Sequence, residues 1–375
     1  MLVQMNNLTY ITYQTFPAFT ANSIQTMSNI KYLVKQGFSV TLFFPLREKT
    51  STDNSKKLQE FYSIREEFKI VGSKHNLPFG KINMFNRVLF LFSHLIWSYT
   101  NVNKLIKEKP SSELFFTRSD WVFFFLSRKN RKVVFECHQY TKIRKYLISK
   151  ALKKETSKII FLNNNLKDDY EKKYNLKNNY IILHNGVDIE NYSSSDNRKD
   201  NEIVFVGKLK RFGETRNIEF LLKALKSLDK KYSLKIVGAE KSEIIELEKQ
   251  SKKLGVEKRI KIHSRVDYSK VAEYLLSSSF GILINSSSNT HSTSYTSPLK
   301  YFEYLAAGLK VIAVDFPSHR DLPFSENIEY YQEDNLRSFV SAIERARYLK
   351  NPDINLFKKI SLETRAKKIS ELLVN

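Results

Sequence analysis

Short apolar segments of strand length alternate with amphipathic segments of helix length along this chain, and the alternation runs through twice. Strands that alternate with helices form parallel sheets, because each helix carries the chain back across one face of the sheet. The first half holds the expected strands Leu8–Tyr13, Ser39–Phe44, Leu114–Thr117, Val133–Glu136, Ile159–Leu162 and Tyr180–Leu183. The second half holds Glu202–Val206, Leu234–Val237, Lys261–His263, Gly281–Ile284 and Val311–Val314. The pattern predicts an α/β fold with two Rossmann-like parallel-sheet domains facing a central cleft.

The length of 375 residues also favours two domains, since single cores rarely grow beyond about 250–300 residues. The polar, charged segment Ser193–Asn201 lacks periodicity and is the expected linker. We therefore expect an N-terminal domain over 1–192 and a second domain over 193–354. The amphipathic stretch Asn355–Val374 predicts a C-terminal helix within 355–375 that packs back on the first domain.

Two helices are predicted from the spacing of their apolar residues. Asn22–Gln36 carries Ile24, Met27, Ile30, Leu33 and Val34 on one face. Asn217–Leu228 carries Ile218, Leu221, Leu222, Leu225 and Leu228 on one face. In parallel α/β sheets ligands bind at the carboxyl ends of the strands, so functional residues are expected directly after strands.

The formal net charge of +23 predicts an anionic partner: a phospholipid surface, nucleic acid or a phosphorylated substrate. The alternative is that part of the excess lysine reflects a composition rich in Lys, Asn, Ile and Tyr. The single cysteine, Cys137, excludes a disulfide framework and is compatible with the cytoplasm. The longest apolar run, Val88–Trp97, is shorter than the ~20 residues that a membrane span needs.

The most informative segment runs from Ser297 through Pro298 to Gly308 and has the signals of a capped helix. Serine is expected to cap the helix, proline to occupy its first turn and glycine to end it. An apolar strand, Val311–Val314, follows, and the polar stretch Thr290–Thr296 precedes. The start of this helix is expected to offer free N–H groups and a partial positive charge, which suits a phosphate.

Lys300 adds a full positive charge within the first turn of that helix, and Glu303 lies about one turn further on. A carboxylate at this place can bind the hydroxyls of a ribose. An ordinary capped helix is the alternative, but it does not explain a lysine and a glutamate in an otherwise apolar helix. The pair points to an enzyme that uses a nucleotide sugar.

A basic loop follows the strand Glu202–Val206 and contains Gly207, Lys208 and Arg216. Glycine permits a close approach of the backbone to a ligand. The two cations are placed to bracket a diphosphate, the arginine in bidentate fashion. The alternative is a solvated loop, which is normal in so basic a chain.

Histidine 138 follows the strand Val133–Glu136 in the sequence Glu-Cys-His-Gln. At a strand's carboxyl end His138 can hydrogen-bond a sugar hydroxyl or a phosphate, and the alternative is a structural histidine. The spacing of the histidines shows no metal-binding pattern. The sequence His184-Asn185-Gly186-Val187-Asp188 predicts a tight turn after the strand Tyr180–Leu183.

The stretch Phe79–Lys107 is helical in pattern and unusually apolar. Its basic residues Lys81, Arg87, Lys104 and Lys107 flank the apolar residues Phe85, Val88, Leu89, Phe92, Leu95, Ile96 and Trp97. A basic helix with aromatics can lie in a membrane interface. A core helix of the first domain is the alternative, and it is slightly favoured.

In the order of these motifs the chain resembles the GT-B glycosyltransferases, specifically glycosyltransferase family 4, over nearly its whole length. The segment 297–308 with Val311–Asp315 is similar to the family's donor-binding helix and next strand. The segments 205–208, 185–188 and 136–138 are similar to the start of its second domain, its turn before the linker and its histidine-bearing segment. Tyr295 stands eight residues before Glu303, where the family has a glutamate, and the family's glycine-rich first loop is absent.

The resemblance implies a retaining transfer of a sugar from a nucleotide diphosphate to an acceptor hydroxyl, without a metal or other cofactor. It implies that His138, Lys208 and Arg216 act in catalysis, with Glu303 binding the ribose. The donor contacts that it implies are Gly207, Lys208, Arg216, Tyr295, Thr296, Ser297, Leu299, Lys300 and Glu303. The expected acceptor is a glycan or a lipid-linked intermediate of polysaccharide or glycolipid synthesis.

With the charge, the resemblance predicts a cytoplasmic protein that associates peripherally with an anionic membrane surface. Three alternatives stay open. The chain could be a nucleotide-sugar epimerase of the same fold, a basic protein that binds or modifies nucleic acid, or a membrane-associated scaffold without activity. Nucleic acid is the less favoured partner, because no helix-turn-helix, zinc spacing or RNA-binding aromatic motif is present.

Overall fold

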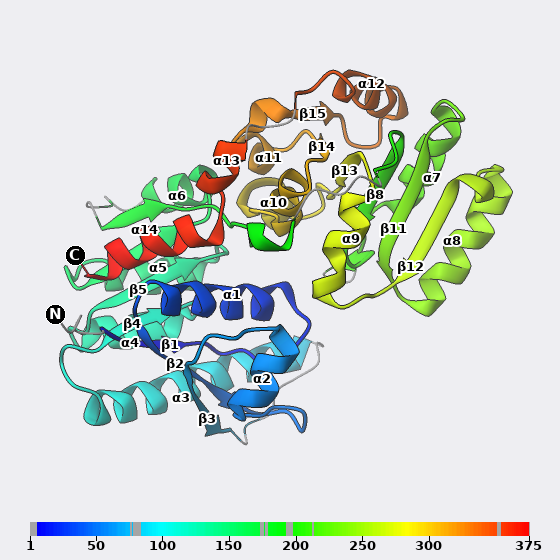
Figure 1. Ribbon diagram of the computed structural model, residues 1–375. Coiled ribbons are helices and arrows are strands. Elements are labelled where there is room, and N and C mark those ends of the chain that lie inside the picture. The colour runs from blue at the N-terminus through cyan, green and yellow to red at the C-terminus, as the bar shows by residue number, and fades with distance from the viewer. Residues whose placement is uncertain are drawn as a thin grey trace. The chain divides into compact units, whose positions relative to one another are not determined.

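The computed structural model describes residues 6–75, 77, 84–172, 176, 179–192, 198–211, 214–350 and 354–374 (Figure 1). The chain forms two compact units, Met1–Leu183 with Leu362–Asn375, and His184–Ser361. Each unit has a parallel β-sheet with helices packed against it, which confirms the predicted fold class. The predicted functional division of the chain into 1–192, 193–354 and 355–375 stays a prediction. The predicted central cleft also stays a prediction.

The first unit has a seven-stranded sheet in the order β3-β2-β1-β4-β5-β6-β7. Its strands are β1 (Asn7–Ile11), β2 (Ser39–Leu46), β3 (Lys69–Lys74), β4 (Leu114–Thr117), β5 (Val133–Cys137), β6 (Ser157–Phe161) and β7 (Tyr180–Ile182). Its helices are α1 (Ala21–Lys35), α2 (Ser55–Tyr62), α3 (Met84–Glu108), α4 (Asp120–Arg128), α5 (Lys142–Ala151), α6 (Asn164–Glu171) and α14 (Leu362–Val374). All pairings in this sheet are parallel.

Local signals in the sequence start several of these helices. Thr20, Ser119, Thr141 and Asn163 precede α1, α4, α5 and α6, and each side-chain oxygen accepts a hydrogen bond from the backbone N–H three residues further on. Such a cap satisfies an N–H group that has no partner within the helix. Four strands of the first unit, β1, β4, β5 and β6, are thus each followed by a helix that starts at a defined residue.

The alternation of side chains along β2 builds the two faces of the first sheet. Phe44 belongs to the core beneath α1, α2 and α14, whereas the neighbouring Phe43 contacts Trp97 of α3 at a ring distance of 5.8 Å. Successive side chains of a strand point to opposite faces, so one apolar run can cover both sides of a parallel sheet.

The second unit has a six-stranded parallel sheet in the order β12-β11-β8-β13-β14-β15. Its strands are β8 (Glu202–Val206), β11 (Ser233–Ala239), β12 (Ile260–Ser264), β13 (Phe280–Leu283), β14 (Lys310–Val314) and β15 (Ile328–Tyr331), with a small hairpin of β9 (Lys210–Arg211) and β10 (Glu214–Thr215). Its helices are α7 (Ile218–Ser227), α8 (Lys241–Leu254), α9 (Val271–Leu276), α10 (Leu299–Ala306), α11 (Pro317–Arg320), α12 (Leu336–Ala346) and α13 (Ile354–Lys359).

The helices α7, α8 and α12 share one core with the sheet of the second unit, and α9 and α10 share another. The predicted inner face of α7 is confirmed, because Ile218, Leu221, Leu222, Leu225 and Leu228 are all buried. On α1, Met27, Ile30 and Leu33 are buried as predicted, while Ile24 and Val34 are only half-buried.

Two strands of the parallel sheets were not predicted, β3 and β15, and neither was the small hairpin of β9 and β10. Both β3 and β15 lie at an edge of a sheet; no residue of β3 is buried, and the two central residues of β15 are half-buried. An edge strand is covered less completely than a central one, so its sequence need not be continuously apolar. Lys69 and Lys74 in β3 hide the strand from a search for apolar runs.

The prediction of one helical stretch over Asn355–Val374 is wrong in one respect, because the structure contains two helices, α13 and α14. Between them the carbonyl of Ile360 accepts a hydrogen bond from the N–H of Val187 at 3.1 Å, and Ser361 pairs with Val187 in a β-bridge. The helix is interrupted there, at the residue where the two compact units divide. The predicted helix 79–107 is described from Met84 onward, and residues 79–83 lie outside the described residues.

Candidate functional site

The sheet of the second unit has a point where its order reverses. The chain runs from β8 outward to β11 and β12, and then returns to the other side of β8 with β13. The strands β8 and β13 pair only through Ile203 with Phe280 and Val204 with Gly281. Ligands of open α/β sheets bind outside the carboxyl ends of the strands at such a point.

Tyr304 of α10 fills the gap where β8 and β13 separate. Its hydroxyl accepts a hydrogen bond from the N–H of Val206 at 3.4 Å and donates one to the carbonyl of Ile282 at 3.3 Å. A Cβ on Gly281 would lie 2.5 Å from the Tyr304 ring, so the ring needs glycine in β13. Tyr304 thereby fixes α10 to both strands at the reversal point.

Two glycines stand at the ends of neighbouring strands, Gly207 after β8 and Gly238 within β11. Both have positive φ angles, +129° and +112°. A Cβ on Gly238 would lie 2.8 Å from the carbonyl oxygen of Gly207, and a Cβ on Gly207 would lie 2.6 Å from Nζ of Lys300. Only glycine tolerates these angles and contacts, so the Lys300 side chain can lie directly against the backbone at the end of β8, where the Gly207 N–H donates to the carbonyl of Val237 at 2.8 Å.

Lys300 lies in the first turn of α10, and its ammonium group is held at the end of β8. Nζ lies over the ring of Phe205, 4.1 Å from the ring centroid, and beside Gly207. The cation–π contact with Phe205, together with the space left by the missing side chain of Gly207, thus holds a positive charge where the strand ends. The structure brings together Lys300 and Gly207, which lie far apart in the sequence.

Lys208 and Arg216 lie on the loop that follows Gly207. Lys208 is exposed, whereas Arg216 is half-buried and its N–H donates to the carbonyl of Leu209 at 2.8 Å. The structure therefore places both cations on the same loop as Gly207, one facing solvent and one partly covered. Their catalytic roles stay predictions.

The start of α10 differs from the prediction in one detail. The helix begins at Leu299 and Pro298 stands at the capping position, so Ser297 does not cap it. The Ser297 hydroxyl instead accepts a hydrogen bond from the N–H of Asn185 at 3.0 Å, and the Asn185 side-chain amide donates to the carbonyl of Ser297. The segment 185–188, where a turn was expected, is therefore hydrogen-bonded through Asn185 to the residue Ser297 that precedes α10.

The end of α10 is as predicted. Gly308 has a φ of +68°, its N–H donates to Leu305 at 2.8 Å, and the N–H of Leu309 donates to Tyr304 at 2.9 Å. These two bonds form a Schellman motif, which requires a residue that tolerates the left-handed conformation.

Glu303 is buried within α10, at 6% exposure. Burial raises the pKa of its carboxyl group, and the hydroxyl of Tyr268 and the charge of Lys300 offset only part of that rise. Tyr268 comes from a short turn, Tyr268–Lys270, and its hydroxyl donates to Glu303. A buried carboxylate that its own surroundings do not fully stabilise is suited to accept hydrogen bonds from a ligand.

Asp188 adds a second negative charge to this part of the unit. The charges of Glu303 and Asp188 both raise the pKa of Tyr268 and of Tyr192, after burial, which is the largest cause. The residues of the turn 185–188 therefore lie beside the buried glutamate as well as beside the helix start, which sequence spacing alone did not predict.

Two further predicted contacts, Tyr295 and Thr296, directly precede the start of α10. A π-helical turn, His291–Tyr295, leads into this stretch, and both residues are buried, as is Ser297. Leu299 is half-buried. The structure gathers these predicted residues around the amino end of α10, and their contacts with a donor stay predictions.

His138 lies in the first unit, at the end of β5, and both nitrogens of its ring are engaged. Arg118 donates to Nδ1 at 3.1 Å, so Nε2 carries the proton and donates to Glu136 at 2.5 Å. Burial and the charge of Arg118 lower the pKa of His138 to about 3, which keeps the ring neutral. This geometry favours the alternative of a structural histidine, and catalysis by His138 stays a prediction.

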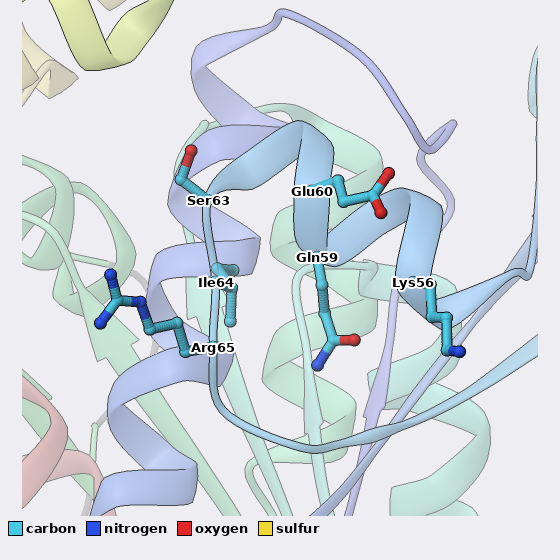
Figure 2. A pocket seen from close by; sticks show the side chains of 6 residues that line it. All are labelled: Lys56, Gln59, Glu60, Ser63, Ile64 and Arg65. Carbon is cyan, nitrogen blue, oxygen red and sulfur yellow. The ribbon is translucent and has the colours of Figure 1, made fainter.

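A hollow lies beside the end of α2 in the first unit (Figure 2). It is lined by Lys56, Gln59, Glu60, Ser63, Ile64 and Arg65. In Figure 2 the charged side chains of this set point in different directions and do not converge on one place. None of the predicted functional residues lines this hollow, so it adds nothing to the site described above.

Three residues of the site were missed by sequence reasoning: Gly238, Tyr304 and Tyr268. A signal existed for Gly238, because it follows the apolar run Leu234–Val237 as Gly207 follows Glu202–Val206. No pattern marks the two tyrosines. Tyr304 contacts Val206, and Tyr268 contacts Glu303, and in each pair the two residues are far apart in the sequence.

Comparison with known proteins finds a family match within the second unit. Residues 200–347 match the family described as "Glycosyl transferases group 1". This range includes Gly207, Lys300 and Glu303. No curated protein matches the chain in sequence.

Solved structures match nearly the whole chain. Sucrose-phosphate synthase from Thermosynechococcus elongatus aligns with a TM-score of 0.72 and 14% identity, covering 98% of each chain. HepE from Anabaena, solved in complex with UDP, aligns with a TM-score of 0.69 and 14% identity, covering 98% of this chain and 99% of that one. The lipopolysaccharide outer core galactosyltransferase WaaB aligns with a TM-score of 0.66 and 15% identity, covering 98% of both chains. The resemblance to GT-B glycosyltransferases is confirmed, and the narrower assignment to family 4 stays a prediction.

Proposed function

We propose that this protein transfers a sugar from a nucleoside diphosphate to an acceptor hydroxyl, with retention at the anomeric carbon. The proposed acceptor is a glycan or lipid-linked intermediate of polysaccharide or glycolipid synthesis. The protein is proposed to work in the cytoplasm, at the surface of an anionic membrane, and without a metal ion. UDP-sugars are the first donors to test, because the neighbouring HepE was solved with UDP.

One observation carries the proposal. The backbone of Gly207, the ammonium group of Lys300 that lies against it and the amino end of α10 meet at the reversal point of the sheet, and buried Glu303 lies one turn along the same helix. Backbone N–H groups, a helix dipole and a fixed cation are the groups that bind a phosphate. A carboxylate about one helical turn away is placed to accept the hydroxyls of a ribose.

The chemistry follows from where charge develops. When the bond between the sugar and the diphosphate breaks, negative charge grows on the leaving diphosphate. Lys300, Lys208 and Arg216 then stabilise that charge, and a cation fixed in advance does so without reorganisation. The three side chains differ in exposure. Lys300 is held against Phe205, Arg216 is half-buried, and Lys208 is exposed and can approach the phosphate from solvent.

The test has two steps. Calorimetry with UDP, GDP, CDP and their sugars identifies the base, and NMR of the product formed with a lipid-linked acceptor gives the anomeric configuration. We expect tight binding of one nucleotide, and a product that keeps the configuration of the donor. Binding of no nucleotide contradicts the proposal, and a new free sugar formed from the donor without an acceptor favours the epimerase.

A further inference from the structure

Helix α3 of the first unit exposes many large apolar side chains between Val88 and Tyr99, whereas Val102 and Leu105 further along the helix are buried. Its inner face carries Ser93, His94 and Ser98 as well as Trp97, all buried. The outward residues are Val88, Leu89, Leu91, Phe92, Ile96 and Tyr99, each 40–59% exposed. A helix that only covers a sheet turns its apolar stripe inward. Here the large apolar side chains are presented to the surroundings.

The polar inner face of α3 is held by specific hydrogen bonds. The Ser93 hydroxyl lies 2.8 Å from the hydroxyl of Tyr13 and 2.8 Å from Nε2 of His75. Nε2 of His94 lies 2.7 Å from the hydroxyl of Ser119. Turning α3 over would break these bonds and leave buried polar groups without partners, so its orientation is fixed.

The exposed apolar strip continues across α4, which contacts both α3 and α5. The ring of Tyr99 lies 5.4 Å from that of Phe125, and Phe125 lies 6.0 Å from Trp121, both half-buried on α4. On α5, Ile143 and Tyr146 are 54% and 55% exposed. We call the exposed residues of these three helices, together with the half-buried Trp121 and Phe125, the α3–α5 surface.

The charge of the α3–α5 surface is mostly positive. No acidic residue occurs in α3 before the exposed Glu108 at its end. Helix α5 has no acidic residue and carries the exposed Lys142 and Lys150 and the half-buried Arg144, whereas its Lys145 is buried. The acidic residue of α4, Asp120, pairs with Arg144 at 3.3 Å. Exposed cations also stand beside the aromatic rings, with Arg128 over Phe124 at 5.8 Å and Lys150 over Tyr146 at 5.5 Å.

We propose that the α3–α5 surface docks on an anionic lipid bilayer, with the apolar side chains of α3 inserted among the lipids and the cations at the headgroups. The idea that docking brings the protein to a lipid-linked acceptor rests on the proposed function. Aromatic and aliphatic side chains beside lysine and arginine fit the boundary between headgroups and acyl chains. Among the described residues no helix is long and apolar enough to cross a bilayer, so docking is on the surface.

Two observations favour lipid over other occupants. A second copy of the chain would bring the same basic surface against itself, because symmetric dimers contact through identical patches. Like charges would then face each other. Nucleic acid would use the cations but leave Phe92 and Ile96 in water, whereas a bilayer takes both kinds of side chain.

The experiment measures sedimentation of the full chain with vesicles of phosphatidylglycerol and of phosphatidylcholine, without any donor. We expect binding to the anionic vesicles and about tenfold weaker binding for the double variant Phe92→Ser, Ile96→Ser, since two exposed apolar groups are lost. Lys142→Gln with Lys150→Gln should weaken binding about fivefold for each charge. The matched control removes exposed apolar groups from the second unit, Ile245→Ser with Tyr348→Ser, and should bind as the unchanged protein does.

A second readout uses the two tryptophans of the chain. Trp97 is 1% exposed, whereas Trp121 lies on the α3–α5 surface. Brominated lipid should quench part of the fluorescence, and Trp121→Phe should abolish that part while Trp97→Phe leaves it. Quenching that survives Trp121→Phe overturns the proposal.

Other outcomes are equally decisive. Equal binding by the Phe92→Ser, Ile96→Ser variant, or no binding to anionic vesicles, overturns the proposal. So does a dimer that this variant dissociates while vesicle binding is unchanged. If the unchanged protein binds UDP but not anionic vesicles, this inference alone is wrong. If it binds the vesicles but no nucleotide, the proposed function alone is wrong.

Discussion

Two buried glutamates, one in each unit, have opposite surroundings. Glu136 in β5 is fully buried and bonded by Arg365 at 2.6 Å and His138 at 2.5 Å, with Arg118 3.5 Å away. These positive charges and hydrogen bonds outweigh burial and hold its pKa well below the usual value. For Glu303, burial outweighs the help of Tyr268 and Lys300, and the pKa is raised.

The difference distinguishes a carboxylate that is stabilised within the fold, Glu136, from one that we propose to bind the donor, Glu303. Glu136 has its partners within the fold, and through Arg365 it binds α14 to the first unit, where Arg365 also reaches Asn29 of α1 at 2.9 Å. Glu303 has fewer partners than a buried charge needs. A buried group whose environment disfavours its charge is a frequent mark of a site that awaits a ligand.

The largest expected effect is on stability in the first unit. Glu136→Gln should lower the free energy of unfolding by about 3–5 kcal/mol, because it leaves Arg365 buried without its counter-charge. The measurement is urea unfolding at neutral pH. Since the pKa of Glu136 is depressed, the stabilisation exists at neutral pH and is lost as the pH falls through the folded-state pKa. Unchanged unfolding would show that Arg365 finds another partner.

Glu303→Gln sharpens the comparison from the other side. Donor affinity should fall about 10- to 100-fold, in line with the ~1.5–3 kcal/mol of hydrogen bonds to a charged group. Stability should stay equal or rise, because a carboxyl with a raised pKa opposes folding once it is ionised. Calorimetry with the donor nucleotide and urea unfolding measure the two effects. Glu326→Gln, at an exposed position of the same unit, is the control, and a large loss of stability in Glu303→Gln would contradict the comparison.

Lys208→Ala should slow turnover about tenfold while KM changes little, which corresponds to ~1.4 kcal/mol of transition-state stabilisation. The physical reason is that charge on the leaving diphosphate grows only in the transition state. Steady-state kinetics separate kcat from KM. Lys210→Ala removes an exposed charge two residues away and should leave kcat unchanged, so equal losses in both variants would mean general electrostatics only.

The smallest expected effect is on pH dependence. Because the pKa of Glu303 is raised, the carboxylate becomes protonated at a higher pH than an ordinary glutamate, and donor affinity should begin to weaken there as the pH falls. Binding measured across the acidic range tests this. The Glu303→Gln variant reports the titration of the nucleotide itself, and identical profiles for both proteins would remove Glu303 from the binding step.

The parallel-sheet fold could be predicted from the sequence because central strands are continuously apolar. The central strands β8 and β14 were predicted correctly, whereas the edge strands β3 and β15 were missed. The sequence also singled out Gly207, Lys300 and Glu303, since each has a chemical reason to follow a strand or lie near the start of a helix, and their contacts with a donor stay predictions. The role of Ser297 was misjudged, because its partner Asn185 lies over a hundred positions away.

The sequence by itself determined the two sheets and the helix from Leu299 to Ala306, because apolar periodicity and helix ends act over a few residues. It also named the residues that we propose to bind a diphosphate. Tertiary structure alone decided that Gly238 lies against Gly207, that Tyr304 joins β8 to β13, and that both nitrogens of His138 are occupied. It also decided that Phe92, Ile96 and their apolar neighbours in α3 are exposed while Trp97 is buried. Burial and hydrogen-bond partners depend on residues from distant parts of the chain, and these set the pKa of each glutamate.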